Sequence, residues 1–110
     1  MTDIALSQPG VLYHVTIGSN LDSIWSDGID PHYSKGKFEA SWYVTKEHIL
    51  WAVLHVAHRH DCKLDDIFVC SAVIQWSSMR RTNKQGRFCT QKCFQIEQAS
   101  PALWYVNGET

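Results

Sequence analysis

The chain has 110 residues, a formal net charge of −1 and 13 aromatic residues: five Trp, four Tyr and four Phe. This length predicts one domain, and the balanced charge gives no argument for nucleic acid or a membrane surface as a partner. No apolar run is long enough to span a bilayer, and residues 1–10 lack the features of a secretory signal. We therefore expect a cytoplasmic protein without a membrane partner, whose cysteines are reduced thiols.

The N-terminal part of the chain predicts a short lead-in followed by a strand. Residues 1–10 are expected to be a loose lead-in that ends in the turn pair Pro9-Gly10, and residues 11–110 to form a single domain. The segment from Val11 to Thr16 is rich in aromatic and β-branched residues, which is typical of a strand.

A short helix is predicted after this strand. Ser19 and Asp22 have the spacing of a capping box, and Gly28 suits the left-handed position that follows a helix. Apolar residues at helical spacing are expected to pack against a sheet: Leu21, Ile24 and Trp25.

The middle of the chain predicts a loop, a strand and a longer helix. The polar segment 32–38 is expected to be a loop and 41–44 a second strand, after which Thr45 could cap a helix that runs to about His60. The predicted helix carries an apolar stripe of Ile49, Ala52, Val53, Val56 and Ala57, widened by Leu50 and Leu54, and Trp51 is expected to be buried with it.

The C-terminal part predicts three further strands. A central strand is expected from Ile67 to Trp76, a polar loop over 77–86, and two closing strands over 88–97 and 103–106. The resulting order, β-α-β-α-β-β-β, cannot give an all-parallel sheet and favours an α+β fold.

Three short motifs fall on the predicted strands in a distinctive order. Tyr13-His14-Val15-Thr16 lies on the first strand and Ser41-Trp42-Tyr43-Val44-Thr45 on the second, with Trp51-Ala52 in the helix that follows; Gln95-Ile96-Glu97 lies on a late strand, with Pro101 shortly after it. With these motifs the chain resembles the ADP-ribosyltransferase superfamily, in the branch that has a histidine on its first strand. The similarity extends over about residues 11–106.

The resemblance implies an α+β fold in which a split β-sheet, two short flanking helices and a cleft for NAD come together. It implies that NAD is a substrate, that nicotinamide is released and that ADP-ribose passes to an acceptor. In this interpretation His14 binds the adenine-side ribose, and the Val15 backbone binds the nicotinamide amide with help from Thr16. Tyr43 stacks on nicotinamide, with Trp42 as the alternative, and Ser41 belongs to the same NAD-binding motif.

The catalytic group implied by the resemblance is Glu97, with Gln95 orienting the acceptor. Cleaving the nicotinamide–ribose bond builds positive charge on the sugar, and a nearby carboxylate stabilises that charge in the transition state. The acceptor is not identified: a protein, a nucleic acid and a small molecule all remain open. The small stand-alone members of the resembled family suggest a microbial or phage-encoded modifier or toxin, with a possible neutralising partner protein.

Two other interpretations remain open. A transferase-like module could bind a nucleotide or a protein partner without chemistry. A small zinc-stabilised binding domain could use nitrogen and sulfur ligands, drawn from His55, His58, His60, Cys62, Cys89 and Cys93. Their spacing matches no standard zinc motif, so we predict no metal site.

Two basic segments could contact anions. The run from Arg80 to Arg87 is expected to be a solvated loop, or else a contact for a polyanionic substrate or for the phosphates of NAD. The segment 34–37 has two lysines and a glycine and could hold phosphates, although a flexible polar loop is the simpler interpretation.

Overall fold

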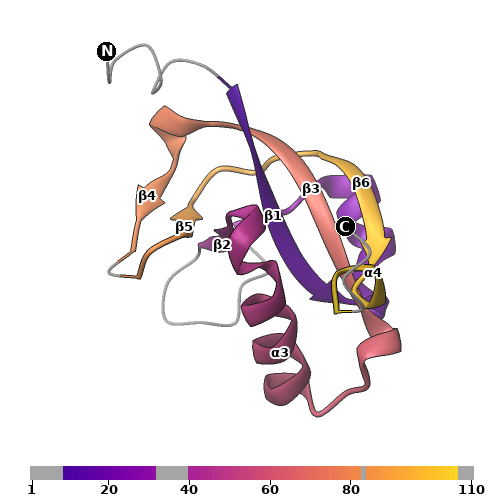
Figure 1. The fold of residues 1–110 in the computed structure, drawn as a ribbon. Helices are drawn as coiled ribbons and strands as arrows, with labels where there is room; N and C mark the ends of the chain where they lie inside the picture. The colour runs from indigo at the N-terminus through magenta and orange to yellow at the C-terminus, as the bar shows by residue number, and fades with distance from the viewer. Residues whose placement is uncertain (1–8, 32–39, 83, 107–110) are drawn as a thin grey trace.

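Six strands form one antiparallel sheet with the order β4-β5-β2-β1-β3-β6 (Figure 1). The computed structural model describes residues 9–31, 40–82 and 84–106. The strands are β1 (Pro9–Ile17), β2 (Ser41–Val44), β3 (Ile67–Gln75), β4 (Arg80–Arg81), β5 (Arg87–Thr90) and β6 (Ile96–Pro101). The helices are α2 (Leu21–Asp27), α3 (Ile49–His60) and α4 (Leu103–Val106). The predicted α+β class is confirmed.

The sheet consists of two halves that meet at a narrow contact. In the long half, which comprises β1, β3 and β6, β1 pairs with β3 at nine consecutive positions from Pro9↔Gln75 to Ile17↔Ile67. In the short half, which comprises β4, β5 and β2, β2 pairs with β5 at four positions. The two halves are joined through β1 and β2, whose only ladder pair among the described residues is Tyr13↔Val44. We call this contact the seam.

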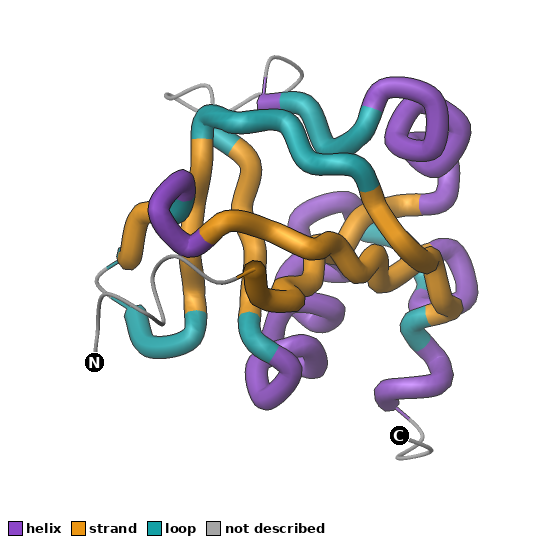
Figure 2. Tube along the Cα trace, turned by 90° about the horizontal axis from the view of Figure 1, so that it is seen from above, coloured by secondary structure: helices purple, strands orange, loops and turns teal. Residues whose placement is uncertain are grey.

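Each face of the sheet has its own apolar core because strand side chains alternate between faces. One core contains Leu12, Tyr43 and Cys70 from the strands together with Ile24 of α2. The other contains Val44, Ile67 and Val69 together with residues of α3. In Figure 1, α3 lies in front of the sheet and α2 behind it. In Figure 2 the strands form a middle layer, with helical segments below it and loops together with a helix above it.

The entry into α2 differs from the prediction, whereas its end at Gly28 agrees in position and in the sign of φ. The 3-10 helix Gly18–Asn20 follows β1 directly, so Ser19 lies inside this turn, and Asn20 occupies the cap position without a side-chain cap bond. The capping-box prediction is therefore wrong. Gly28 has a positive φ of +79°, as predicted, but its ψ of −177° lies outside the left-handed helical region, and its N–H donates to the Ile24 carbonyl at 2.8 Å. Only glycine adopts such a conformation without strain.

The helix α3 ends at His60 as predicted, but its start is built differently. The 3-10 helix Lys46–His48 precedes it, and the Thr45 hydroxyl bonds to the His48 ring nitrogen Nδ1 at 3.0 Å instead of capping a backbone amide. The stripe buries Ile49, Ala52 and Val53, whereas Leu50 and Leu54 are exposed.

The expected burial of two tryptophans is wrong. Trp25 and Trp51 are both exposed, with 51% and 39% of their surface accessible. Trp25 follows the buried Ile24 by one position, and one helical residue rotates a side chain by about 100° away from the core.

The closing segments differ most from the prediction. The expected strand over 88–97 is divided into β5 and β6 by the residues 91–95, and the expected strand over 103–106 is the helix α4. Buried Ala102 donates its N–H to the Ile67 carbonyl, and its own carbonyl accepts from Tyr105 and Val106. This anchoring at Ala102 overrides the strand preference of a four-residue apolar run.

The predicted loop over 77–86 contains the two-residue strand β4 and the start of a hairpin. At the N-terminus, β1 begins at Pro9, two residues before the predicted start. The remainder of the predicted lead-in, the loop at 32–38 and the possible phosphate segment 34–37 lie outside the described residues. Among the described helices, none has the length and apolarity needed to cross a membrane.

Candidate functional site

His14 lies on β1 at the seam and is held by a backbone group of the neighbouring strand. Its Nδ1 lies 2.8 Å from the carbonyl oxygen of Trp42 on β2. A carbonyl only accepts, so Nδ1 carries the proton and Nε2 of the neutral ring keeps its lone pair. Burial lowers the pKa of His14, although the bond to the Trp42 carbonyl opposes this shift. The ring is therefore neutral at pH 7, with Nε2 as an acceptor.

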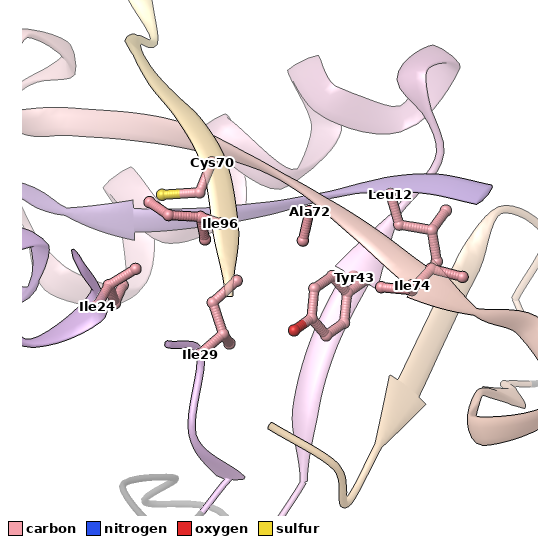
Figure 3. Packing of buried hydrophobic residues seen from close by; sticks show 8 residues of the cluster. All are labelled: Leu12, Ile24, Ile29, Tyr43, Cys70, Ala72, Ile74 and Ile96. Carbon is pink, nitrogen blue, oxygen red and sulfur yellow. The ribbon is translucent and has the colours of Figure 1, made fainter. Parts of the chain in front are cut away.

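Tyr43 lies on β2 on the same face as His14. The centroids of the two rings are 5.7 Å apart, and Phe94 packs edge-on against Tyr43 with a centroid distance of 6.4 Å. The side chain is 1% exposed, and its hydroxyl has no hydrogen-bond partner among the described residues. Figure 3 shows the ring among the aliphatic residues of its core, with the hydroxyl oxygen on the side of Ile29. Such an orphaned polar atom is uncommon in a native core.

Two further members of the predicted NAD-binding set lie on this face. Thr16 is buried two residues beyond His14 on β1, and its Oγ1 accepts from Asn20 Nδ2 at 2.9 Å. Ser41 is buried two residues before Tyr43 on β2. The structure thus places His14, Thr16, Ser41 and Tyr43 on one side of the sheet, and the described contact among them is the ring pair of His14 and Tyr43.

The side chains of Val15 and Trp42 point to the opposite face. Val15 packs against the core beneath α3 and pairs with Val69 of β3. Trp42 is 53% exposed and reaches the site only through the carbonyl that holds His14. Of the two predicted aromatic residues, Tyr43 therefore lies on the face of His14, and its ring is buried.

The predicted catalytic residues lie at the far edge of the sheet. Glu97 is on β6, which is separated from β2 by β1 and β3, and its side chain is exposed. The β3–β6 register passes from Ala72↔Ile96 to Ser71↔Gln98, which leaves Glu97 as the extra residue of a β-bulge. Gln95 precedes β6 and is also exposed. No described contact joins either residue to His14 or Tyr43.

Sequence reasoning missed the residues that surround Tyr43. Cys70 lies directly opposite His14 in the β1–β3 register, and Phe94 reaches Tyr43 from the segment before β6. Burial raises the pKa of Cys70 to about 11, so its thiol stays protonated at neutral pH and is a poor nucleophile. The alternation of β3 could have placed Cys70 on this face, but no local signal connects residue 94 with residue 43.

The residues of the zinc interpretation do not come together in the described structure. None of the four cysteines forms a disulfide in the structure. Within residues 9–31, 40–82 and 84–106, no three His, Cys, Asp or Glu side chains lie close enough to hold a metal ion. His55 instead stacks on Trp51, with ring centroids 5.0 Å apart.

A shallow depression lies on the other side of the sheet, lined by Lys46, Glu47, Ile49, Leu50 and Tyr105. It contains none of the predicted site residues, and we assign it no role.

Comparison with known proteins identifies no relative. No family model, no curated protein and no solved structure matches the chain.

Proposed function

We propose that the chain binds NAD at the seam and acts as an ADP-ribosyltransferase, releasing nicotinamide and transferring ADP-ribose to an acceptor. The observation that carries this proposal is the pair of His14 and Tyr43, with ring centroids 5.7 Å apart where the two halves of the sheet meet. The narrow contact between the two halves of the sheet supports the proposal, because the family resemblance implies a split sheet.

His14 is suited to hold a ribose hydroxyl. Its Nδ1–H is engaged by the Trp42 carbonyl, so the ring is fixed in one tautomer and Nε2 can accept from a hydroxyl group. The buried hydroxyl of Tyr43 has no described partner and offers a second polar group on the same face. Nicotinamide stacking on Tyr43 requires Phe94 and its neighbours to move away from the ring.

The transfer step requires a carboxylate near the ribose, and Glu97 is the candidate. In the reaction the bond between nicotinamide and the ribose C1′ breaks, the acceptor forms a new bond to C1′, and the acceptor proton passes to a base. Stabilising the positive sugar would need Glu97 to approach the seam from the bulge of β6. A carboxylate at a bulge has more freedom of direction than one in a regular ladder.

The position of Glu97 on β6 favours a second candidate function. A module that binds NAD or ADP-ribose without transfer needs His14 and Tyr43 but no carboxylate. The two functions predict the same ligand and differ only in whether nicotinamide is released.

The test is nicotinamide release from NAD, followed by proton NMR with the pure protein and then with added cell lysate. The transferase proposal predicts release that Glu97→Gln abolishes and that Glu47→Gln leaves unchanged, because Glu47 is an exposed carboxylate on the other side of the sheet. NAD binding without release supports the second candidate. Absence of NAD binding to the folded protein overturns both.

The binding role of His14 needs its own variant. His14→Ala should weaken NAD binding about tenfold, since one hydrogen bond to a ligand hydroxyl contributes roughly 1–1.5 kcal/mol. His58→Ala is a matched control because His58 is exposed on α3. If His14→Ala and the wild type bind NAD with equal affinity, NAD does not bind at the seam.

A further inference from the structure

The basic residues of the chain are concentrated in one segment. Between Ile67 and Ile96 the sequence has five basic residues and no acidic one, although the whole chain has a net charge of −1. Three of the five, Arg80, Arg81 and Arg87, lie on β4 and β5 of the short half. Although the total charge is nearly balanced, the short half of the sheet is therefore cationic.

An exposed tryptophan lies in the same cross-strand row as one of these arginines. Arg80 of β4 pairs with Cys89 of β5, and Cys89 pairs with Trp42 of β2. Residues directly opposite each other in a ladder point to the same face. Arg80 is exposed, and Trp42 is 53% exposed, so a guanidinium and an indole flank Cys89 on one accessible surface.

A second arginine on this face is held in a fixed orientation. Arg87 pairs with Val44, two residues along β2 from Trp42, so its side chain points to the same face. Its guanidinium carbon lies 3.4 Å from the centroid of the Trp51 ring, and His55 stacks on the same indole. An arginine stacked flat on a tryptophan keeps its terminal N–H groups at the edge of the stack, where they can donate to an anion.

The β4–β5 hairpin, which carries Arg80 and Arg87, is attached to the residue that links β2 to the 3-10 helix before α3. The Thr45 N–H donates to the Gly86 carbonyl at 3.0 Å. The Thr82 hydroxyl lies 3.1 Å from the carbonyl oxygens of both Lys84 and Arg87 and shares its one proton between them, which fixes the turn. The relative positions of Arg87 and Trp42 are thus set by hydrogen bonds on both sides of β5.

We propose that this face of the short half, which carries Arg80, Arg87 and Trp42, binds single-stranded nucleic acid. A base stacks on the exposed indole of Trp42, and neighbouring phosphates pair with Arg80 and Arg87. Accessible aromatic rings beside cationic groups are the combination that single strands require, because every base offers a ring face and every linkage a phosphate. A duplex hides its base faces and would leave the indole unused.

The proposal is independent of the NAD site, because the side chains of Trp42 and Tyr43 point to opposite faces of β2. A protein partner with an acidic surface is the competing occupant. It would be attracted by the same arginines but would not need the ring face of Trp42.

The test is fluorescence anisotropy of a labelled oligothymidylate and an oligouridylate, each about 12 nucleotides long to cover a binding site of typical size. We expect saturable binding at about 50 mM salt that weakens toward about 200 mM, with log K falling by roughly 0.7 for each phosphate contact against log salt. No binding to the folded protein at the lower salt concentration overturns the proposal.

Matched variants separate stacking from charge. Trp42→Ala should weaken binding about tenfold through loss of base stacking. Trp25→Ala is the control, because Trp25 is similarly exposed but lies on α2. Arg80→Ala should reduce the salt slope by about one phosphate contact, whereas Arg59→Ala, at the end of α3, should not. Thermal unfolding verifies that each variant is folded.

Two competitors identify the ligand class. Polyaspartate should displace the oligonucleotide only at much higher concentration, and AMP should be a weak competitor. Polyaspartate binding that equals oligonucleotide binding and is unaffected by Trp42→Ala would assign the face to an acidic protein. If AMP competes as strongly as the oligonucleotide at equal base concentration, the face binds mononucleotides. Either result overturns the proposal.

Discussion

The two halves of the sheet have opposite characters. The long half has a nine-pair ladder between β1 and β3, and its strands contain one charged residue, Glu97. The short half has a four-pair ladder between β2 and β5, and its strands contain three arginines. Fully buried aliphatic side chains such as Leu12, Val69 and Ile74 come from the long half.

This difference suggests that the long half of the sheet stabilises the fold and the short half is available to bind ligands. A strand buried on both faces must be apolar, as β3 is over most of its length, and cannot present polar groups to a ligand. A short strand pair at the edge of the sheet contributes less apolar burial and is free to carry charge. His14 and Tyr43 lie where the two halves meet, and among the described residues this contact has a single ladder pair.

The largest expected effect tests whether the long half carries the stability. Leu12 is 1% exposed, so Leu12→Ala should lower the free energy of unfolding by about 2–5 kcal/mol through lost burial and a residual cavity. Trp42→Ala, in the short half, should change it by less than about 0.5 kcal/mol because the ring is exposed. Urea unfolding of both variants gives the comparison, and equal losses would contradict it.

The next effect concerns the hydrogen bond across the seam. His14→Ala leaves the Trp42 carbonyl without its ring donor and should cost about 1–3 kcal/mol of unfolding free energy. In His14→Gln the side-chain amide can donate to the Trp42 carbonyl in place of the ring, so this variant should regain part of the lost unfolding free energy. A Gln variant no more stable than the Ala variant would argue that the contribution comes from packing alone.

The pH dependence of stability tests the contribution of the neutral His14 ring at the seam. Because burial lowers the pKa of His14 below its ordinary value of 6.5, the unfolded chain takes up this proton first as the pH falls. The stability that the neutral ring contributes is fully present above pH 6.5 and is lost as the pH falls toward the lowered pKa. Unfolding measured between about pH 7.5 and 5 should therefore show a steeper acid loss for the wild type than for His14→Gln.

A smaller effect tests the orphaned hydroxyl on the short half. Tyr43→Phe removes a buried polar atom that has no described partner, so stability should stay unchanged or rise by up to about 1 kcal/mol. Burial raises the pKa of Tyr43, which is consistent with an unfavourable ionised form. A loss of more than about 1 kcal/mol in calorimetry would mean that the hydroxyl is hydrogen-bonded in solution.

The smallest effect measures how firmly the short half is attached to α3. A double-mutant cycle of Arg87→Ala and Trp51→Ala should give a coupling of about 0.5–1 kcal/mol, the usual range for a partly exposed cation–π contact. Additive losses would show that the stacked geometry contributes nothing measurable. A coupling well above this range would indicate that the short half depends on this contact for its structure.

Local sequence patterns were sufficient where a segment's own chemistry decides its structure. The β-branched and aromatic run from Ile67 predicted β3, and the apolar spacing predicted α3 to its end at His60. Gly28 adopts the positive φ that its place after a helix predicted. Short segments were less informative: the apolar run Leu103–Val106 fits a strand by composition, but it forms a helix because Ala102 is anchored to β3.

The sequence by itself determined the α+β class, the strand that carries His14 and the strand that carries Tyr43, because alternation and helical spacing are local properties. Only the tertiary structure decided that Tyr43 rather than Trp42 faces the core, and that β6 pairs with β3, far from β2. Both depend on which strands become neighbours. Strand order is set by burial and ladder pairing over the whole chain, and no short motif records it.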